Sequence, residues 1–325
     1  MSMVLGISVA SGGWVLASLN SSGEWDLHFA ASFHDGKMAA SDIFLPSSLL
    51  EKVVQSRISL VNLPISSLSA QSVKDGLITP DDVMHREDGA RRLLRERVVN
   101  GGRFVGSVPS SPVLEAVYAS NYEEAADLHK QITGKTLTKQ SWNMIFRIKQ
   151  VRAILQVVPV LSSSILEAHP ETLFRLLNQN CQSAKKKKKD AGVLLSKRTQ
   201  EGIEQRIDLL EDAWPTARQT YEEAWEDWGK NERVQRENLL DAMVLAVCAN
   251  AGVQEKYFLV PRIEQGVLLE QKIPVVDLSA SKLGGIHSRR RDHLASLDFP
   301  ETFLRDDQNA PYCTVFSNSI FCTKK

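Results

Sequence analysis

Apolar and β-branched residues dominate several short segments of the chain, and this pattern predicts the strands of a β-sheet. A break that contains Gly12 and Gly13 separates the first two segments, which is typical of a hairpin. A later apolar run ends at Pro64, because proline cannot donate a hydrogen bond to a neighbouring strand. The predicted strands are residues 4–10, 14–20, 25–31, 57–63 and 163–168.

A different spacing, with apolar residues three and four positions apart, predicts helices between and after these strands. In the most regular segment Leu240, Met243, Val244 and Val247 share one helical face. Helices that follow antiparallel hairpins and lead into further apolar strands predict an α/β fold with helices packed on a mixed sheet. The predicted helices are residues 47–56, 120–160, 197–213, 217–233 and 236–250.

The order of these segments predicts one large domain over residues 1–275. Residues 66–160 form a helical insertion within it, and its first part is rich in serine, glycine and charge. Residues 276–325 lack a clear period and are expected to form a carboxyl-terminal extension.

Lysine plus arginine and aspartate plus glutamate each number 39, so no overall charge attracts the chain to nucleic acid. Attraction would have to come from local runs such as Lys185–Lys189 and Arg289–Arg291, which are otherwise solvated surface. The four cysteines form no C-x-x-C pair, which argues against a zinc site. No apolar run approaches ~20 residues and no charged-then-apolar leader opens the chain, so we expect a cytoplasmic protein outside the membrane.

Seven segments, taken in order, resemble the family of predicted RNase H-like nucleases known as domain of unknown function 429. The resemblance covers roughly residues 4–275, and the EAHPE and KRTQEG motifs are its most specific parts. The segments are GISVASGGW (6–14), VNLPISSL (61–68), EDGARRLL (87–94), LTKQSWNMIFRIKQV (137–151), LEAHPETLF (166–174), SKRTQEGIEQRIDLL (196–210) and ENLLDAMVLA (237–246).

This resemblance implies an RNase H-like fold, in which an antiparallel meander continues into parallel strands, and a phosphodiester hydrolase that uses two divalent ions. It implies acidic residues at three places where this chain is neutral: Ser8 in the first strand, Asn62 after the fourth, and Asn238 in the last helix. Because Mg²⁺ and Mn²⁺ prefer charged oxygen ligands, the depletion predicts weakened or absent metal binding and catalysis.

The candidate catalytic and metal-binding carboxylates are then Glu167, Glu237 and Asp241, with Ser8, Asn62 and Asn238 lining the pocket. Glu237 and Asp241 are four residues apart, so they share one helical face. Glu167 fits a structural ion pair equally well, and Glu171 fits a role in the first turn of a helix. Asp241 favours a site role, because a half-buried carboxylate on an apolar helix needs a partner.

Lys197, Arg198 and Arg206 are candidates for binding phosphate, and a solvated helix face is the equal alternative. Arg198, Gly202 and Arg206 share a stripe, and the small residue between the two arginines suits the close approach of another backbone segment. Arg91, Arg92, Lys139, Arg147 and Lys149 are further basic candidates.

Three functions remain open. The first is an RNase H-like protein that cleaves or binds nucleic acid, with catalysis impaired. The second is a non-catalytic interaction protein on the same fold, which would bind a protein partner through residues 276–325. The third, an actin-like phosphotransferase, ranks last because the chain shows no second phosphate loop.

Overall fold

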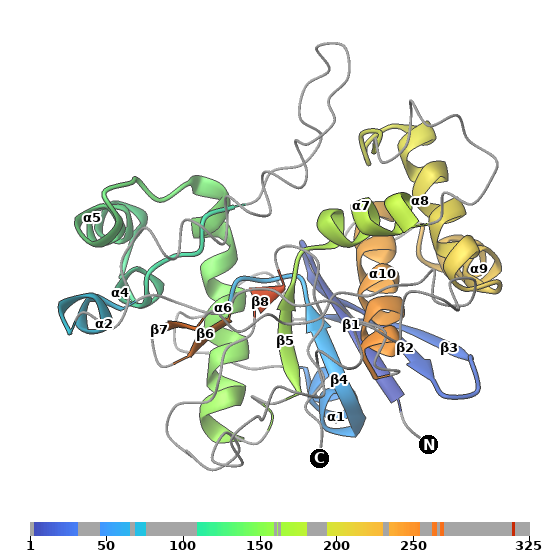
Figure 1. Cartoon of the computed structure of the whole chain (residues 1–325), viewed down its shortest axis with the longest axis horizontal. Coiled ribbons are helices and arrows are strands. Elements are labelled where there is room, and N and C mark those ends of the chain that lie inside the picture. Colours follow the sequence, from blue (N-terminus) through green and yellow to red (C-terminus); the bar gives the residue numbers. More distant parts are fainter. Residues whose placement is uncertain are drawn as a thin grey trace, which may run out of the picture.

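A mixed six-stranded sheet forms the centre of the structure, with strand order β3-β2-β1-β4-β5 and a two-residue sixth strand beside β5 (Figure 1). The structure is a computed structural model that describes residues 3–31, 46–65, 69–75, 109–158, 161, 164–180, 194–229, 234–253, 262–264, 267–269 and 314–315. The strands are β1 (Met3–Ala10), β2 (Gly13–Asn20), β3 (Trp25–Ala31), β4 (Ser56–Val61) and β5 (Ile165–Ala168). Strands β1, β2 and β3 are antiparallel, whereas β4 runs parallel to β1 and β5 runs parallel to β4.

Helices cover both faces of this sheet. They are α1 (Ser47–Gln55), α2 (Ala70–Lys74), α4 (Leu114–Val117), α5 (Tyr122–Thr133), α6 (Lys139–Val157), α7 (Pro170–Asn180), α8 (Gln200–Ala213), α9 (Ala217–Trp228) and α10 (Arg236–Val253). Figure 1 shows α10 against one face with α7, α8 and α9 around it, and α6 on the opposite side. A short pair, β6 (Arg262–Glu264) and β7 (Val267–Leu269), forms a separate sheet, and β8 (Thr314–Val315) pairs with β5 as the sixth strand of the main sheet.

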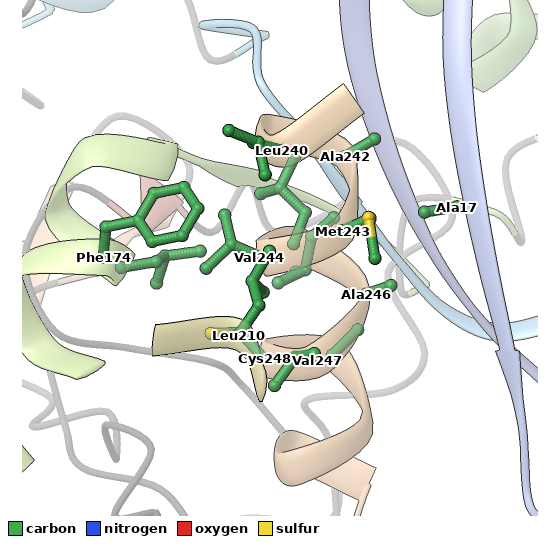
Figure 2. Close-up of a cluster of buried hydrophobic side chains, with 14 of the residues drawn as sticks. Ala17, Phe174, Leu210, Leu240, Ala242, Met243, Val244, Ala246, Val247 and Cys248 are labelled. Atoms are coloured by element: carbon green, nitrogen blue, oxygen red, sulfur yellow. The ribbon is translucent and has the colours of Figure 1, made fainter. Parts of the chain in front are cut away.

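Helix α10 lies between the sheet and an outer layer of helices. Figure 2 shows Met243 and Ala246 turned toward Ala17 of β2, while Val244 faces Phe174 of α7. Residues from Leu239 to Ala249 are at most 2% exposed. A helix that is apolar all round is expected in such a position, and any polar group on it must find a partner inside the protein.

Gly6 brings β1 into direct contact with this helix. A Cβ atom at Gly6 would lie 2.0 Å from the carbonyl oxygen of Ala242 and 2.9 Å from Cβ of Leu245. Only a residue without a side chain permits this approach. The opposite face of the sheet holds a second apolar layer, in which Leu5 and Ile7 pack with residues of α6 such as Ile148.

The predicted strands and the helix at 236–250 are confirmed as elements, but several helix boundaries differ from the sequence prediction; the helix expected over 217–233, for example, ends at Trp228. The helix expected over 120–160 is two helices, because Gly134 ends α5 in the left-handed conformation with φ of 72°. The helix expected from residue 197 begins at Gln200, since the Thr199 side chain accepts a hydrogen bond from the Gly202 amide and caps it. Arg91, Arg92 and the runs 185–189 and 289–291 lie outside the described residues.

Candidate functional site

Strand β1 and helix α10 bring Ser8 and Asp241 to the same place. Leu245 faces Gly6, and Asp241 precedes Leu245 by four residues, about one helical turn or 5.4 Å. Ser8 follows Gly6 by two residues, about 6.6 Å along the same face of the strand. Asn238 lies one further turn back and donates a hydrogen bond from Nδ2 to the Val9 carbonyl at 3.0 Å. Ser8 therefore lies opposite the turn of α10 that carries Asp241.

Asn62 joins this group from the neighbouring strand. Ile7 pairs with Val61, so Ser8 and Asn62 are adjacent on the next register position. The backbone N–H of Asn62 donates a hydrogen bond to the Ile7 carbonyl at 2.9 Å. The structure thus brings together the three neutral positions that the sequence analysis singled out, Ser8, Asn62 and Asn238, beside Asp241.

Glu167 lies on the other face of the sheet. It pairs with Val61, which pairs with Ile7, and both of these side chains belong to the layer that packs on α6. Its neighbours Leu166 and Ala168 belong to the layer on α10. Because side chains alternate along a strand, Glu167 points toward α6 and away from Asp241.

Asp241 is part of a buried ionic group that we call the buried charge cluster: Asp241, Lys197, Glu171 and Arg206. The Lys197 ammonium lies 2.8 Å from Oδ2 of Asp241 and 3.9 Å from Oε1 of Glu171. Arg206 donates from an NH2 group to Oε2 of Glu171 at 2.7 Å. Side-chain exposure is 3% for Asp241, 7% for Glu171, 0% for Arg206 and 29% for Lys197. Two carboxylates and two cations balance one another in charge.

The loop before α8 holds Lys197 in this cluster. Arg206 donates from Nη1 to the Leu195 carbonyl at 3.0 Å and to the Gly202 carbonyl at 2.7 Å. A Cβ atom at Gly202 would lie 1.9 Å from the carbonyl oxygen of Ser196, so the loop packs directly on the first turn of the helix. The close approach predicted at Gly202 is confirmed, and it aims Lys197 at α10.

Burial sets the protonation of the cluster. It raises the pKa of the Asp241 carboxyl; the Lys197 cation opposes that shift and Glu171 adds to it. Burial lowers the pKa of Lys197, but the charges of Asp241 and Glu171 outweigh it and the net pKa is raised. These shifts favour a neutral carboxyl and a charged ammonium, respectively. Since Lys197 contacts two carboxylates, we take the charged form of the pair to prevail at neutral pH.

Three buried oxygens in this region accept no hydrogen bond from any described residue: Oγ of Ser8, Oδ1 of Asp241 and Oε1 of Glu171. The exposed fraction is 0% for Ser8 and 2% for Asp241. An unsatisfied buried acceptor is costly, so such atoms point to a ligand or to water.

The divalent ion implied by the family resemblance does not fit this arrangement. Within the described ranges no group of three or more histidine, cysteine, aspartate or glutamate side chains is placed to hold a metal. Mg²⁺ needs several oxygen ligands that carry net negative charge. Here the Lys197 ammonium already donates a hydrogen bond to Oδ2 of Asp241. Glu237 lies one turn before Asp241, in the partly exposed first turn of α10.

The predicted phosphate-binding residues separate into two kinds. Arg206 is fully buried and donates to a carboxylate and two carbonyls, so in this arrangement it is neither a solvated side chain nor open to a phosphate. Lys197 is paired with Asp241, and Arg198 is exposed. Glu171, to which the sequence analysis gave only a helix-terminal role, is the residue that joins Arg206 to Lys197.

The model of the family described as "Protein of unknown function (DUF429)" matches residues 6–265. The chain belongs to the DUF429 family. The match spans β1, the loop with Lys197, and α10, so the whole buried charge cluster lies within the DUF429 region. Neither curated proteins nor solved structures gave a match. Among the described helices none is long and apolar enough to cross a membrane.

Proposed function

We propose that this DUF429 protein has an RNase H-like fold on which metal-dependent phosphodiester hydrolysis has been lost, and that it acts by binding nucleic acid. The antiparallel meander β1–β3 followed by the parallel strands β4 and β5 is the sheet that this resemblance implies. The observation that carries the proposal is the 2.8 Å contact between Lys197 and Asp241, which places a fixed positive charge on the carboxylate.

The neutral side chains around Asp241 support the loss of hydrolysis. Ser8, Asn62 and Asn238 supply no formal charge, and Lys197 and Arg206 balance Asp241 and Glu171. Two-metal hydrolysis requires an anionic group of ligands that keeps two dications close together. A site without net charge lacks the electrostatic means to do so.

Helix α6 favours nucleic acid as the ligand. It carries four cations and no acidic residue. Arg147 is buried and Arg152 donates to the Ile65 carbonyl, so Lys139 and Lys149 are the two that can contact a ligand. The ammonium of Lys139 lies 3.2 Å from the ring centre of Tyr122, and that of Lys149 lies 5.9 Å from the ring centre of Tyr118. Tyr118 is 51% exposed. Cations beside accessible aromatic rings are the combination that binds single-stranded nucleic acid through phosphates and base stacking.

The test uses the full-length protein with fluorescently labelled single- and double-stranded DNA and RNA, in Mg²⁺ and in Mn²⁺. We expect no cleavage, and binding at low salt that weakens steeply as salt rises. Lys149→Glu should weaken binding at least threefold, whereas Arg57→Glu, an exposed charge on β4, is the matched control and should change it little. Cleavage that disappears in Asp241→Asn would refute the proposal, and so would the absence of binding at low salt.

A protein partner is the second candidate, and the outer surface of α8 and α9 favours it. These helices carry nine acidic residues, namely Glu201, Glu204, Asp208, Glu211, Asp212, Glu222, Glu223, Glu226 and Asp227. Such a surface repels phosphates and suits a basic protein. Stable co-purification of one basic protein, lost when Glu222 and Glu226 are changed to lysine, would favour this candidate over nucleic acid.

A further inference from the structure

Lys197 occupies the position of a cation between two carboxylates. Its ammonium is within 4 Å of oxygens from both Asp241 and Glu171, which come from different helices. Neither carboxylate is on a flexible surface, since Asp241 and Glu171 are 2% and 5% exposed. The space beside Asp241 is therefore built for positive charge.

The remaining oxygens around this space are also those of a cation site. Oδ1 of Asp241 and Oγ of Ser8 accept no hydrogen bond from the described residues, and both are buried. Oε1 of Glu171 has no hydrogen bond there either, and its contact with Lys197 is 3.9 Å long. Carboxylate and hydroxyl oxygens are ligands for hard divalent ions. What opposes a divalent ion is the ammonium.

The backbone of the loop that carries Lys197 is held in place by contacts with α8. This loop is tied down by the hydrogen bonds of Arg206 to Leu195 and Gly202, and Gly202 leaves room for the Ser196 backbone. The same arginine also binds Glu171. One buried residue thus fixes both the loop that supplies the cation and one of its carboxylates.

We propose that the Lys197 ammonium is the resident cation of this pocket and excludes a divalent metal ion, and that removing the ammonium alone turns the oxygens of Asp241, Glu171 and Ser8 into a divalent-cation site. This inference deepens the proposed function and depends on it, because it names the group that replaces the metal. It predicts that Lys197 and a divalent ion are mutually exclusive occupants of one place.

The test is calorimetric titration of Mn²⁺ into the folded full-length protein, with circular dichroism to check the fold. Wild type should show no binding that depends on Asp241. Lys197→Met should bind Mn²⁺ at least tenfold more tightly than wild type, and Lys197→Met/Asp241→Asn should lose that gain. Lys197→Arg keeps the positive charge and is the matched control, so it should gain nothing.

Lys197→Met leaves the cluster with one excess negative charge, which could impair folding. The double variant Lys197→Met/Glu171→Gln keeps the charge balanced and retains a carbonyl oxygen at residue 171, so it should gain Mn²⁺ binding more weakly than Lys197→Met, because Asp241 is then the one carboxylate left beside the ion. Failure of both folded variants to bind Mn²⁺ would overturn the inference. Wild-type binding that Asp241→Asn abolishes would overturn it too.

Failure of this inference and failure of the proposed function give different results. Wild-type cleavage of nucleic acid refutes the loss of hydrolysis. Mn²⁺ bound by wild type at Asp241 without cleavage refutes only the role of Lys197 as the resident cation.

Discussion

Helix α8 has an arginine cluster on each of its two sides, and the two clusters differ mainly in their exposure to water. On the inner side, its own Arg206 binds Glu171 and is completely buried. On the outer side, its acidic residues Glu204, Asp208 and Glu211 bind Arg218 of α9 at 2.6 to 2.7 Å. Arg218 is 26% exposed and these three carboxylates are 42% to 53% exposed.

The contact distances alone would rank the outer cluster first, since Arg218 has more carboxylate partners at shorter range than Arg206. Water reverses this ranking. Exposed ion pairs gain little because both partners are already well solvated, whereas a buried charge that loses its partner has nothing to replace it. The inner cluster therefore stabilises the fold around Asp241, whereas the outer cluster mainly sets the electrostatic potential at the surface of α8 and α9.

The largest expected effect is that of removing the inner arginine. Arg206→Met should lower the free energy of unfolding by about 3–5 kcal/mol, because Glu171 is left buried without its counter-ion and the Leu195 loop loses its tie. Urea denaturation followed by circular dichroism measures this change. Adding Glu171→Gln should recover part of the loss; a double variant that is no better than the single one would show that the ion pair is not the cause.

A smaller, pH-dependent effect is expected at Asp241. Asp241→Asn should lower the free energy of unfolding at neutral pH by roughly 1–2 kcal/mol. This is less than the loss expected for Arg206, because Lys197 keeps Glu171 as a partner. Because the folded protein raises the pKa of Asp241, its native state holds this proton more tightly than the unfolded chain does. Stability of wild type relative to Asp241→Asn should therefore be greatest below the unfolded pKa near 3.8 and decline as pH rises through the folded pKa.

Thermal unfolding of both proteins between pH 3 and pH 8 measures that difference. Each tenfold increase in proton affinity corresponds to about 1.4 kcal/mol. A difference that instead grows with rising pH would mean that Lys197 lowers the pKa of Asp241 more than burial raises it.

The smallest effect is expected from the outer arginine. Arg218→Ala should cost about 0.2–1 kcal/mol, and the cost should shrink in 0.5 M salt because the charges are exposed and screened. The same urea denaturation, at low and high salt, provides the measurement. If Arg218→Ala lowers the free energy of unfolding by more than about 2 kcal/mol, and salt does not change this loss, the exposed cluster stabilises the fold as strongly as the buried one.

Local patterns predicted the sheet and α10 because their information is carried by neighbouring residues. Runs of apolar and β-branched residues with a glycine break predicted β1–β3, and apolar residues three and four positions apart predicted α10. The face to which Glu167 points could not be predicted. The strand Ile165–Ala168 is buried on both sides, so it shows no alternation between apolar and polar positions.

The candidate site was predicted in part. The family resemblance grouped Ser8, Asn62, Asn238 and Asp241, and the fold brings these residues to one edge of the sheet. The pairing of Glu171 with Arg206, 35 residues later, depends on how α7 packs against α8 and leaves no local signal. Gly202 was the one hint, since a glycine between two arginines indicated that another backbone segment approaches there.

A crystal structure of the wild-type protein soaked in Mn²⁺ tests most directly whether the Lys197 ammonium or a divalent ion lies beside Asp241. Anomalous diffraction locates the metal. We predict that the Lys197 ammonium contacts Oδ2 of Asp241 and that no anomalous peak is bonded to this carboxylate. A Mn²⁺ ion bound to Asp241, with Lys197 displaced, would show that the ammonium does not exclude a divalent ion.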